Sequence, residues 1–282
     1  MFSFLLAASL AFVPQDARLA YSFASNLVAR CTPRDAGTPG ARTAADFIFE
    51  HVRRQGAEVR LDVFRAPTAG GERKFANVVA EFRGAPGAGW AVLLSHFDTK
   101  PGAKCPGAND GASTSGLLVA LAAARMRCRD LKTNLLFVWT DGEECRREYG
   151  PKDGLWGARH AADAVAARRL DVRAVICADM IGDRDLKITI PANGSPALTS
   201  TALGAARRIG CPRLVTTTDL YVTDDHAPFL EKGYKAVDLV DFSYGPDNAW
   251  WHTSRDTMEN VSPDSLLKSG RLIAEMLNLL DE

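Results

Sequence analysis

Short apolar runs alternate along this chain with longer segments whose apolar residues recur at helical spacing. The short runs are typical of strands, and they cover residues 58–64, 75–82, 90–95, 134–140, 172–178, 186–190 and 236–240. The longer segments predict helices over residues 15–31, 41–54, 117–126, 154–168 and 196–208, and a last amphipathic helix that starts at Ser262 or Pro263. This alternation favours an α/β fold, a three-layer sandwich in which helices cover both faces of a central mixed, mostly parallel twisted sheet.

Polar residues with metal-binding or acid–base chemistry follow the ends of several predicted strands. In open α/β sheets, ligand sites form outside the carboxyl ends of the strands, so side chains distant in sequence should meet at one edge. The residues in such positions are His96, Asp110, Glu143, Glu144, Asp179 and His252. We therefore expect one site built from these six side chains.

The types of these side chains indicate a divalent metal ion. Two imidazoles and three carboxylates form a nitrogen and oxygen set that suits zinc better than magnesium, although cobalt or manganese could occupy it. Three carboxylates packed together would repel one another without a cation, and Glu143 remains as a further acid or base.

Each residue alone also has a plainer explanation. His96 could be a polar residue at a sheet edge, Asp110 a helix cap, and Asp141-Gly-Glu-Glu144 a solvated turn. Asp179 directly follows an apolar strand, where an unpaired carboxylate is costly. The ordered set is much more specific than any one member.

Composition narrows the class of partner. The chain has 282 residues, 46% of them hydrophobic, and 34 basic residues balance 34 acidic ones. No basic stripe with interleaved aromatic residues is present, so we expect no nucleic-acid partner. We find no internal repeat and no clear linker, and we interpret residues 15–282 as a single zinc-dependent catalytic domain.

Residues 2–13 form an apolar run that is too short to span a bilayer. The run resembles the apolar part of a secretion signal, but the first basic residue is Arg18, so the usual positive start is missing. We treat residues 1–14 as a signal-like segment, with an arm packed on the domain as the alternative. We expect a secreted or periplasmic protein without a stable membrane span, and otherwise a cytoplasmic one.

The six cysteines show no Cys-x-x-Cys spacing, which argues against a sulfur-ligated zinc site. Cys105 and Cys145 both stand near the predicted site. A disulfide between them is open if the protein is exported.

The motifs of the predicted site resemble those of the zinc-dependent aminopeptidase clan, which has a phosphorylase/hydrolase-like fold. The resemblance covers residues from about 40 to 262, and the matching segments are His96-x-Asp98, Gly107-Ala-Asn-Asp110, Asp141-Gly-Glu-Glu144, Asp179-Met-Ile-Gly and His252-Thr. The resemblance implies two zinc ions bridged by Asp110, with His96 and Asp179 completing one site and Glu144 and His252 the other. It also implies that Glu143 is the general base and that Asp98 orients His96.

Three features are similar to one branch of this clan, the glutaminyl-peptide cyclotransferases. The segment Cys145–Asp153 follows the glutamate pair, Asp224-Asp225-His226-Ala-Pro-Phe stands later in the chain, and Trp251 directly precedes His252. Tyr149 falls where some cyclases carry a tryptophan. We expect Trp251 and Tyr149 to line the substrate pocket.

This branch implies one catalytic zinc on Asp110, Glu144 and His252, with a second ion on His96 and Asp179 left open. The expected reaction converts the N-terminal glutamine of peptides or proteins to pyroglutamate and releases ammonia. Glu143 would move the proton, and Asp179 and Asp224 would hold it in a hydrogen-bonded relay. His226 would either support that relay or cap the chain. The alternative activity is a zinc-dependent aminopeptidase.

Overall fold

The computed structural model describes residues 9–128 and 130–282. Its strands are β1 (Glu58–Thr68), β2 (Gly71–Phe82), β3 (Trp90–His96), β4 (Asn134–Thr140), β5 (Val172–Asp179), β6 (Ile188–Ile190), β7 (Val215–Thr217) and β8 (Ala236–Val240). Its α-helices are α1 (Pro14–Cys31), α2 (Pro39–Arg54), α3 (Thr114–Arg127), α4 (Trp156–Ala167), α5 (Pro196–Arg208), α6 (Ala227–Glu231) and α7 (Pro263–Asp281).

The eight described strands form one sheet in the order β1-β2-β4-β3-β5-β8-β6-β7. Strands β4, β3, β5 and β8 at its centre are parallel, whereas β1, β2 and β4 pair in antiparallel fashion, as do β6 and β8. The sheet is therefore mixed and mostly parallel at its centre, which confirms the predicted fold class.

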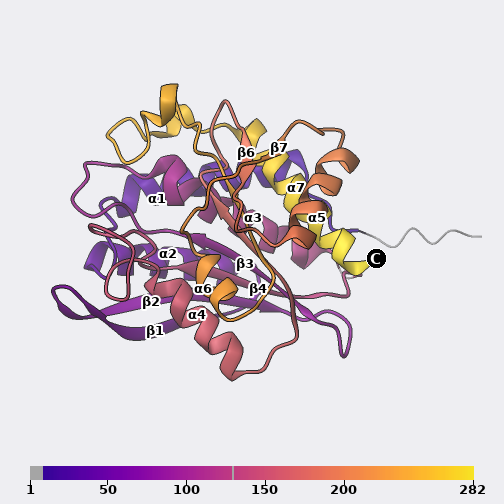
Figure 1. Ribbon diagram of the computed structural model, residues 1–282, viewed down its shortest axis with the longest axis horizontal. Helices are drawn as coiled ribbons and strands as arrows, with labels where there is room; N and C mark the ends of the chain where they lie inside the picture. The colour runs from indigo at the N-terminus through magenta and orange to yellow at the C-terminus, as the bar shows by residue number, and fades with distance from the viewer. Residues whose placement is uncertain (1–8, 129) are drawn as a thin grey trace, which may run out of the picture.

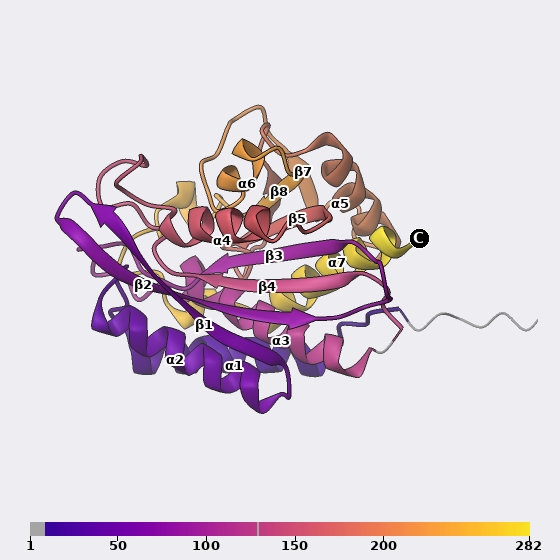
Figure 2. The same ribbon diagram turned by 90° about the horizontal axis from the view of Figure 1, so that it is seen from below.

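Helices cover both faces of the sheet (Figures 1 and 2). Residues of α1, α2, α3, α5 and α7 share one large core with alternate strand residues such as Leu93, Phe137 and Ile176. The strand residues between them, such as Val92 and Val138, face the opposite way and pack with α4 and α6. This alternation follows from the two-residue period of a strand, and it buries the central strands on both sides.

Most predicted elements lie within a few residues of their observed bounds. Strands β1 and β2 extend to a tight hairpin, so the two predicted strands are longer than expected. Strand β7 and helix α6 were not predicted, because they have only three and five residues and are too short for a periodic pattern.

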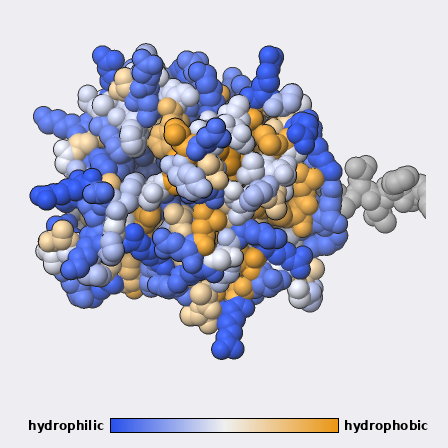
Figure 3. Space-filling view, in the orientation of Figure 1, coloured by the Kyte–Doolittle hydropathy of each residue, from blue (hydrophilic) through white to orange (hydrophobic). Residues whose placement is uncertain are grey.

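The signal-like segment lies partly outside the described residues. Leu10 and Phe12 are buried, and Leu10 exchanges hydrogen bonds with Asn278 of α7. Within the described ranges, no helix is both long and apolar enough to cross a membrane. On the face shown in Figure 3, hydrophilic residues surround small groups of apolar ones.

All six cysteines lie in the described residues, none of them forms a disulfide, and five of them are buried. Cys105 lies beside Asp256, with 3.6 Å between Sγ and Oδ2, and Cys145 lies beside Lys100, with 3.4 Å between Sγ and Nζ. The disulfide between Cys105 and Cys145 is therefore absent from this structure, because each thiol has a different polar neighbour.

Candidate active site

Three parallel strands end at the same edge of the sheet and deliver the predicted residues. β3 ends at His96, β5 ends at Asp179, and β4 ends one residue before the turn that carries Glu143 and Glu144. All four residues are buried. The strand-end argument of the sequence is thus confirmed for these positions.

Asp110 reaches this edge from an irregular turn. It lies in a single π-helical turn, Ala108–Ser113, that departs from helical geometry at Asp110 and Gly111. Gly111 has φ of 91°, and a Cβ there would come within 3.0 Å of the His96 ring. Only glycine therefore allows the turn to pass so close to the histidine.

Asp110 stands between two histidines. Its Oδ1 is 3.1 Å from Nε2 of His96, and its Oδ2 is 3.2 Å from Nε2 of His252. His96 Nε2 is also 3.1 Å from Asp179 Oδ1, and His252 Nε2 is 2.8 Å from Glu144 Oε1. The structure therefore brings all five predicted ligands together as two three-residue groups that share Asp110.

The donor atoms fit a cation. Asp110 Oδ2 and Glu144 Oε2 are buried and accept no hydrogen bond of regular geometry; their nearest cationic atoms are Nε2 of His252, at 3.2 Å, and Nζ of Lys100, at 3.3 Å. Burial, followed by repulsion from Asp110, raises the pKa of Glu144 to about 7. Burial lowers the pKa of His252, but its bonds to Asp110 and Glu144 outweigh this effect and raise it to about 9. A divalent ion would satisfy these oxygens and remove the repulsion.

Asp98 fixes the glutamate turn. Its Oδ1 accepts hydrogen bonds from the backbone N–H of Gly142 (2.9 Å) and Glu143 (3.1 Å), and its Oδ2 accepts from Glu144 (3.1 Å). Its nearest oxygen is 3.6 Å from Nδ1 of His96, which has no hydrogen-bond partner. The carboxylate predicted to orient His96 thus bonds mainly to the backbone of the turn.

Glu143 is buried at the base of a cavity of about 300 Å³. The hydroxyl of Tyr149 donates a hydrogen bond of 2.6 Å to Oε1 of Glu143. Burial, and then repulsion from Glu144, raises the pKa of Glu143 well above its usual value. The cavity is lined by Asp110, Glu143, Glu144, Tyr149, Asp179, Tyr221, Val222, Thr223, Asp224, Phe242, Trp251 and His252.

Aromatic rings form much of the cavity wall. Trp251 is 37% exposed and stacks on the ring of His252, with 4.0 Å between centroids. Phe242 packs edge-on against Trp251 at 5.5 Å. The predicted pocket residues Trp251 and Tyr149 therefore both line the cavity that holds Glu143.

A buried acidic group, Asp224 and Asp225, begins in the wall of the cavity. Asp224 accepts a hydrogen bond from the Cys177 thiol at 3.5 Å, and Asp225 bonds to Thr140. His226 is fully buried and its Nε2 is 2.9 Å from the amide nitrogen of Asn193. Burial lowers the pKa of His226 to about 4, so the ring is neutral and does not ion-pair with Asp224.

Besides the cavity-lining residues Tyr221 and Phe242, two residues that contact the proposed metal ligands were missed from the sequence. Lys100 Nζ lies 3.3 Å from Glu144 Oε2, and Asp256 accepts the backbone N–H groups of Asn109 (2.7 Å) and Asp110 (3.3 Å). Lys100 follows His96 and Asp98 closely in the sequence, and this proximity is a signal that could have identified it as a residue of the site. Asp256 lies in a loop with no sequence pattern that points to the site.

Comparison with known proteins agrees with this geometry. The profile of peptidase family M28 matches residues 77–277. A glutaminyl-peptide cyclotransferase-like protein of Bos taurus is 28% identical over 277 residues, covering 86% of this chain and 71% of the bovine one. The crystal structure of an Acidobacteriales bacterium glutaminyl cyclase has 30% identity and a TM-score of 0.90, covering 100% of this chain and 99% of that one.

A Zn-dependent exopeptidase of Parabacteroides distasonis has the same fold, with a TM-score of 0.82, 21% identity, and coverage of 95% of this chain and 99% of the other. At that identity the likeness extends to the fold alone. The matched profile covers well over half of this chain, and the higher identity lies with the cyclases. The chain thus belongs to peptidase family M28 and, within it, to the glutaminyl cyclase group.

Proposed function

We propose that this protein is a zinc-dependent glutaminyl-peptide cyclotransferase, which converts N-terminal glutamine of peptides or proteins to pyroglutamate and releases ammonia. The observation that carries the proposal is the small cavity walled by Trp251, Phe242 and Tyr149 with the buried Glu143 at its base. A glutamine side chain fits a cavity of about 300 Å³, and an aromatic wall can hold it folded back toward its own amine.

The reaction is intramolecular, so positioning supplies much of the acceleration. The α-amine attacks the γ-carbonyl carbon, the new ring C–N bond forms, and the bond to the amide nitrogen breaks. Glu143 accepts the proton from the amine and passes it to the departing ammonia. Asp179 and Asp224 hold this relay, and the Trp251 indole packs on the substrate side chain.

Zinc would be held by Asp110, Glu144 and His252, the group that opens to the cavity. When bound, the ion supplies Lewis-acid polarisation of the carbonyl oxygen. A second ion on His96 and Asp179 is the alternative stoichiometry, because that group also shares Asp110.

The alternative function is a zinc-dependent aminopeptidase, and the second ligand group favours it. In that reaction Glu143 would take a proton from a water molecule, and the water would attack a peptide carbonyl. Aromatic residues crowd the cavity around Glu143, and this favours the cyclase.

The two functions separate by product mass. The purified protein is incubated with zinc and with two peptides that differ only in their N-terminal residue, glutamine or leucine. We expect the first peptide to lose 17 Da, the mass of ammonia, and the second to remain intact. Release of free leucine would overturn the proposal in favour of the peptidase.

We also propose export to the periplasm or the medium, on the basis of the signal-like run at residues 2–13. Expression of the full chain in its own cells followed by fractionation tests this proposal. Recovery of the whole protein with its N-terminus intact in the cytoplasm would contradict it.

A further inference from the structure

A second cavity, of about 470 Å³, adjoins the candidate active site. Glu144 lines both cavities, and the segment Cys145–Asp153 runs between them. Tyr149 of this segment lines the active-site cavity, whereas Arg146 and Arg147 line the second one. The same loop therefore forms a wall of each cavity.

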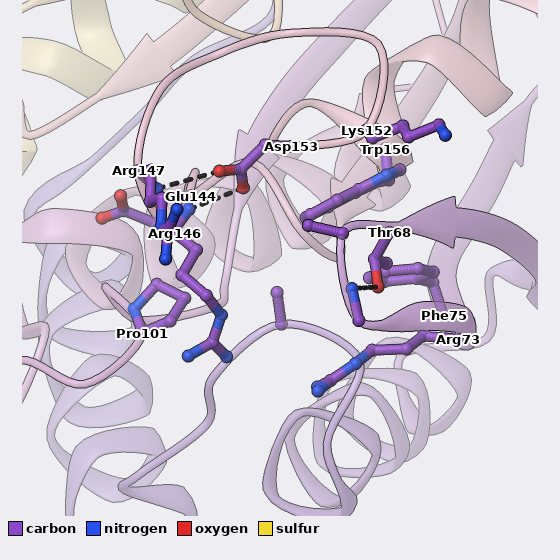
Figure 4. Close-up of a pocket in the computed structure, with 13 residues that line it drawn as sticks. Thr68, Arg73, Phe75, Pro101, Glu144, Arg146, Arg147, Lys152, Asp153 and Trp156 are labelled. Atoms are coloured by element: carbon purple, nitrogen blue, oxygen red, sulfur yellow. Dashed lines mark hydrogen bonds between the residues drawn. The ribbon is translucent and has the colours of Figure 1, made fainter.

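The walls of the second cavity carry four cationic side chains, Arg73, Arg146, Arg147 and Lys152. Within the described ranges, none of the four has an acidic partner within ion-pair distance. Four such side chains therefore form a local group of unpaired positive charge in a chain whose overall charges balance. The guanidinium groups of Arg73 and Arg146 extend toward the same open space, between Pro101 and Phe75 (Figure 4).

The acidic residues in the walls are already engaged. The Asp153 carboxylate accepts the backbone N–H groups of Arg146 (2.6 Å) and Arg147 (2.9 Å), so it holds the loop in shape. Glu144 is 1% exposed and faces Lys100. The accessible charge of the cavity is therefore positive.

The floor of the cavity is apolar and rigid. Phe75 stacks on Trp156 at 5.0 Å and on Phe64 at 5.5 Å. A cavity lined by both buried rings and forked guanidinium groups suits an organic carboxylate, whose two oxygens a guanidinium group can bind together.

We propose that this cavity binds an acidic side chain of the peptide substrate, a few residues after the N-terminal glutamine. This inference rests on the proposed function and extends it to a preference for acidic substrates. An extended chain advances about 3.4 Å per residue, and the two cavities share Glu144, so a few residues of extended chain lead from one cavity into the other. The acidic residue therefore lies beyond the part of the substrate that reacts.

The test compares peptides that begin with glutamine and carry one glutamate, scanned through positions 3 to 8, with an all-neutral peptide of equal length. For the wild-type protein we expect KM to be about 5-fold lower for the best-placed acidic peptide, the size of two or three partly exposed charge contacts. The advantage should shrink in 0.5 M NaCl, because salt screens exposed charges.

The variant R73Q/R146Q should bring the ratio of the two KM values close to one. Arg146→Gln keeps the backbone N–H that donates to Asp153, so the hydrogen bond that holds the loop in shape remains. The matched control R207Q/K268Q removes two exposed charges from α5 and α7, which contribute no residue to the cavity, and should leave the ratio at its wild-type value.

A ratio near one for every peptide on the wild-type protein, or an unchanged ratio in R73Q/R146Q, would overturn the inference. Calorimetric binding of inorganic phosphate with no KM advantage for acidic peptides would also overturn it. If no peptide is cyclised, fluorescence anisotropy of the labelled peptides still decides. Tighter binding of the acidic peptide, lost in R73Q/R146Q, would support the cavity while the proposed function fails.

Discussion

The hydroxyl of Tyr149 donates a 2.6 Å hydrogen bond to Oε1 of Glu143, the carboxyl group at the base of the active-site cavity. The two residues are six positions apart, at the two ends of a turn, so the loop that closes the cavity is tied directly to the proposed proton carrier. Tyr149 is therefore more than a wall of the pocket. It holds the carboxyl group in one orientation.

Tyr149→Phe removes this hydrogen bond and keeps the ring. Hydrogen bonds to a charged group contribute about 1.5 to 3 kcal/mol, so we expect kcat to fall about 10- to 100-fold while KM changes little. Steady-state kinetics on a glutamine-initiated peptide measures both. A Tyr149→Trp variant keeps an aromatic wall without the hydroxyl group, and it tests whether such a wall alone sustains kcat. If Tyr149→Phe lowers kcat and raises KM by equal factors, the substitution has instead damaged the substrate pocket.

Glu143→Gln should lower kcat by about two to four orders of magnitude, because an amide cannot carry the proton. Its zinc content should stay at the wild-type level, since Glu143 is absent from both ligand groups. Mass-based turnover and metal analysis check the two statements. Glu148→Gln removes an exposed charge from the same loop and is the control; an active Glu143→Gln protein would contradict the assignment.

Zinc content should respond differently to the two histidines. His252→Gln should lose zinc and activity together, whereas His96→Gln should keep about one ion per chain if the group with Glu144 is the catalytic site. Chelation should lower the free energy of unfolding, by about 4 kcal/mol from a state with zinc at 1,000 times its Kd. If His96→Gln loses all of its zinc, the protein binds two ions that depend on each other, and the assignment of a single catalytic ion is wrong.

The buried His226 predicts a loss of stability in acid. Its pKa is lowered to about 4 in the folded state, from a usual value near 6.5, so between these values the unfolded chain binds the extra proton. The contribution is fully present above pH 6.5 and falls by about 3 kcal/mol as the pH drops to 4.

Urea unfolding of the wild type and of His226→Gln at pH 4 to 7 isolates this effect as a difference. Glutamine can still accept from the Asn193 amide, and the variant should lose less stability on acidification. His51→Gln, a change at a half-buried histidine of α2, serves as the control. Parallel curves for wild type and His226→Gln would exclude His226 as the source.

Asp238 is a second buried residue whose ionisation should lower the stability of the folded state. It is fully buried in β8, and neither of its carboxylate oxygens has a hydrogen-bond partner. Burial, and then repulsion from Asp224, raises its pKa well above the usual range. The folded state therefore keeps a proton that the unfolded chain has released above about pH 4, and stability falls as the pH rises.

Asp238→Asn removes that pH-dependent cost. We expect the free energy of unfolding to rise by about 1 to 3 kcal/mol at pH 8 and by less at pH 5. The exposed Asp219→Asn is the control. If Asp238→Asn instead lowers the free energy of unfolding at pH 8, the Asp238 carboxylate makes a stabilising contact in the folded state and the prediction is wrong.

The sequence predicts the frame of this molecule well. Strands β3, β4, β5 and β8 are continuous apolar runs, because both faces of a central parallel strand are buried, and such runs end sharply at a polar residue. The strand ends therefore carry His96, the Glu143 turn and Asp179 to one edge. Asp110 and His252 were found as residue types, but their position depends on loops whose shape no periodicity records.

Loop contacts are what the sequence could not supply. The hydrogen bond of Tyr149 to Glu143 and the support of Asp110 by Asp256 depend on tertiary packing between segments 6 and 146 residues apart. The Asp98 carboxylate illustrates the same limit: the family resemblance implied that it orients His96, from which it lies 3.6 Å away, but no pattern pointed to its hydrogen bonds with the N–H groups of the turn after β4.

The Asp98 bonds also bear on how new activities could arise on this scaffold. Asp98, two residues after the end of β3, accepts the backbone N–H groups of the turn after β4, so the backbone of the glutamate pair has a support that lies outside the loop beyond it. The backbone of the glutamate pair is thus fixed from outside the loop, whereas the Glu143 carboxyl group is also held by Tyr149 within it. An exchange of residues 145–153 that keeps this tyrosine should therefore preserve both the backbone position of the pair and the orientation of the Glu143 carboxyl group.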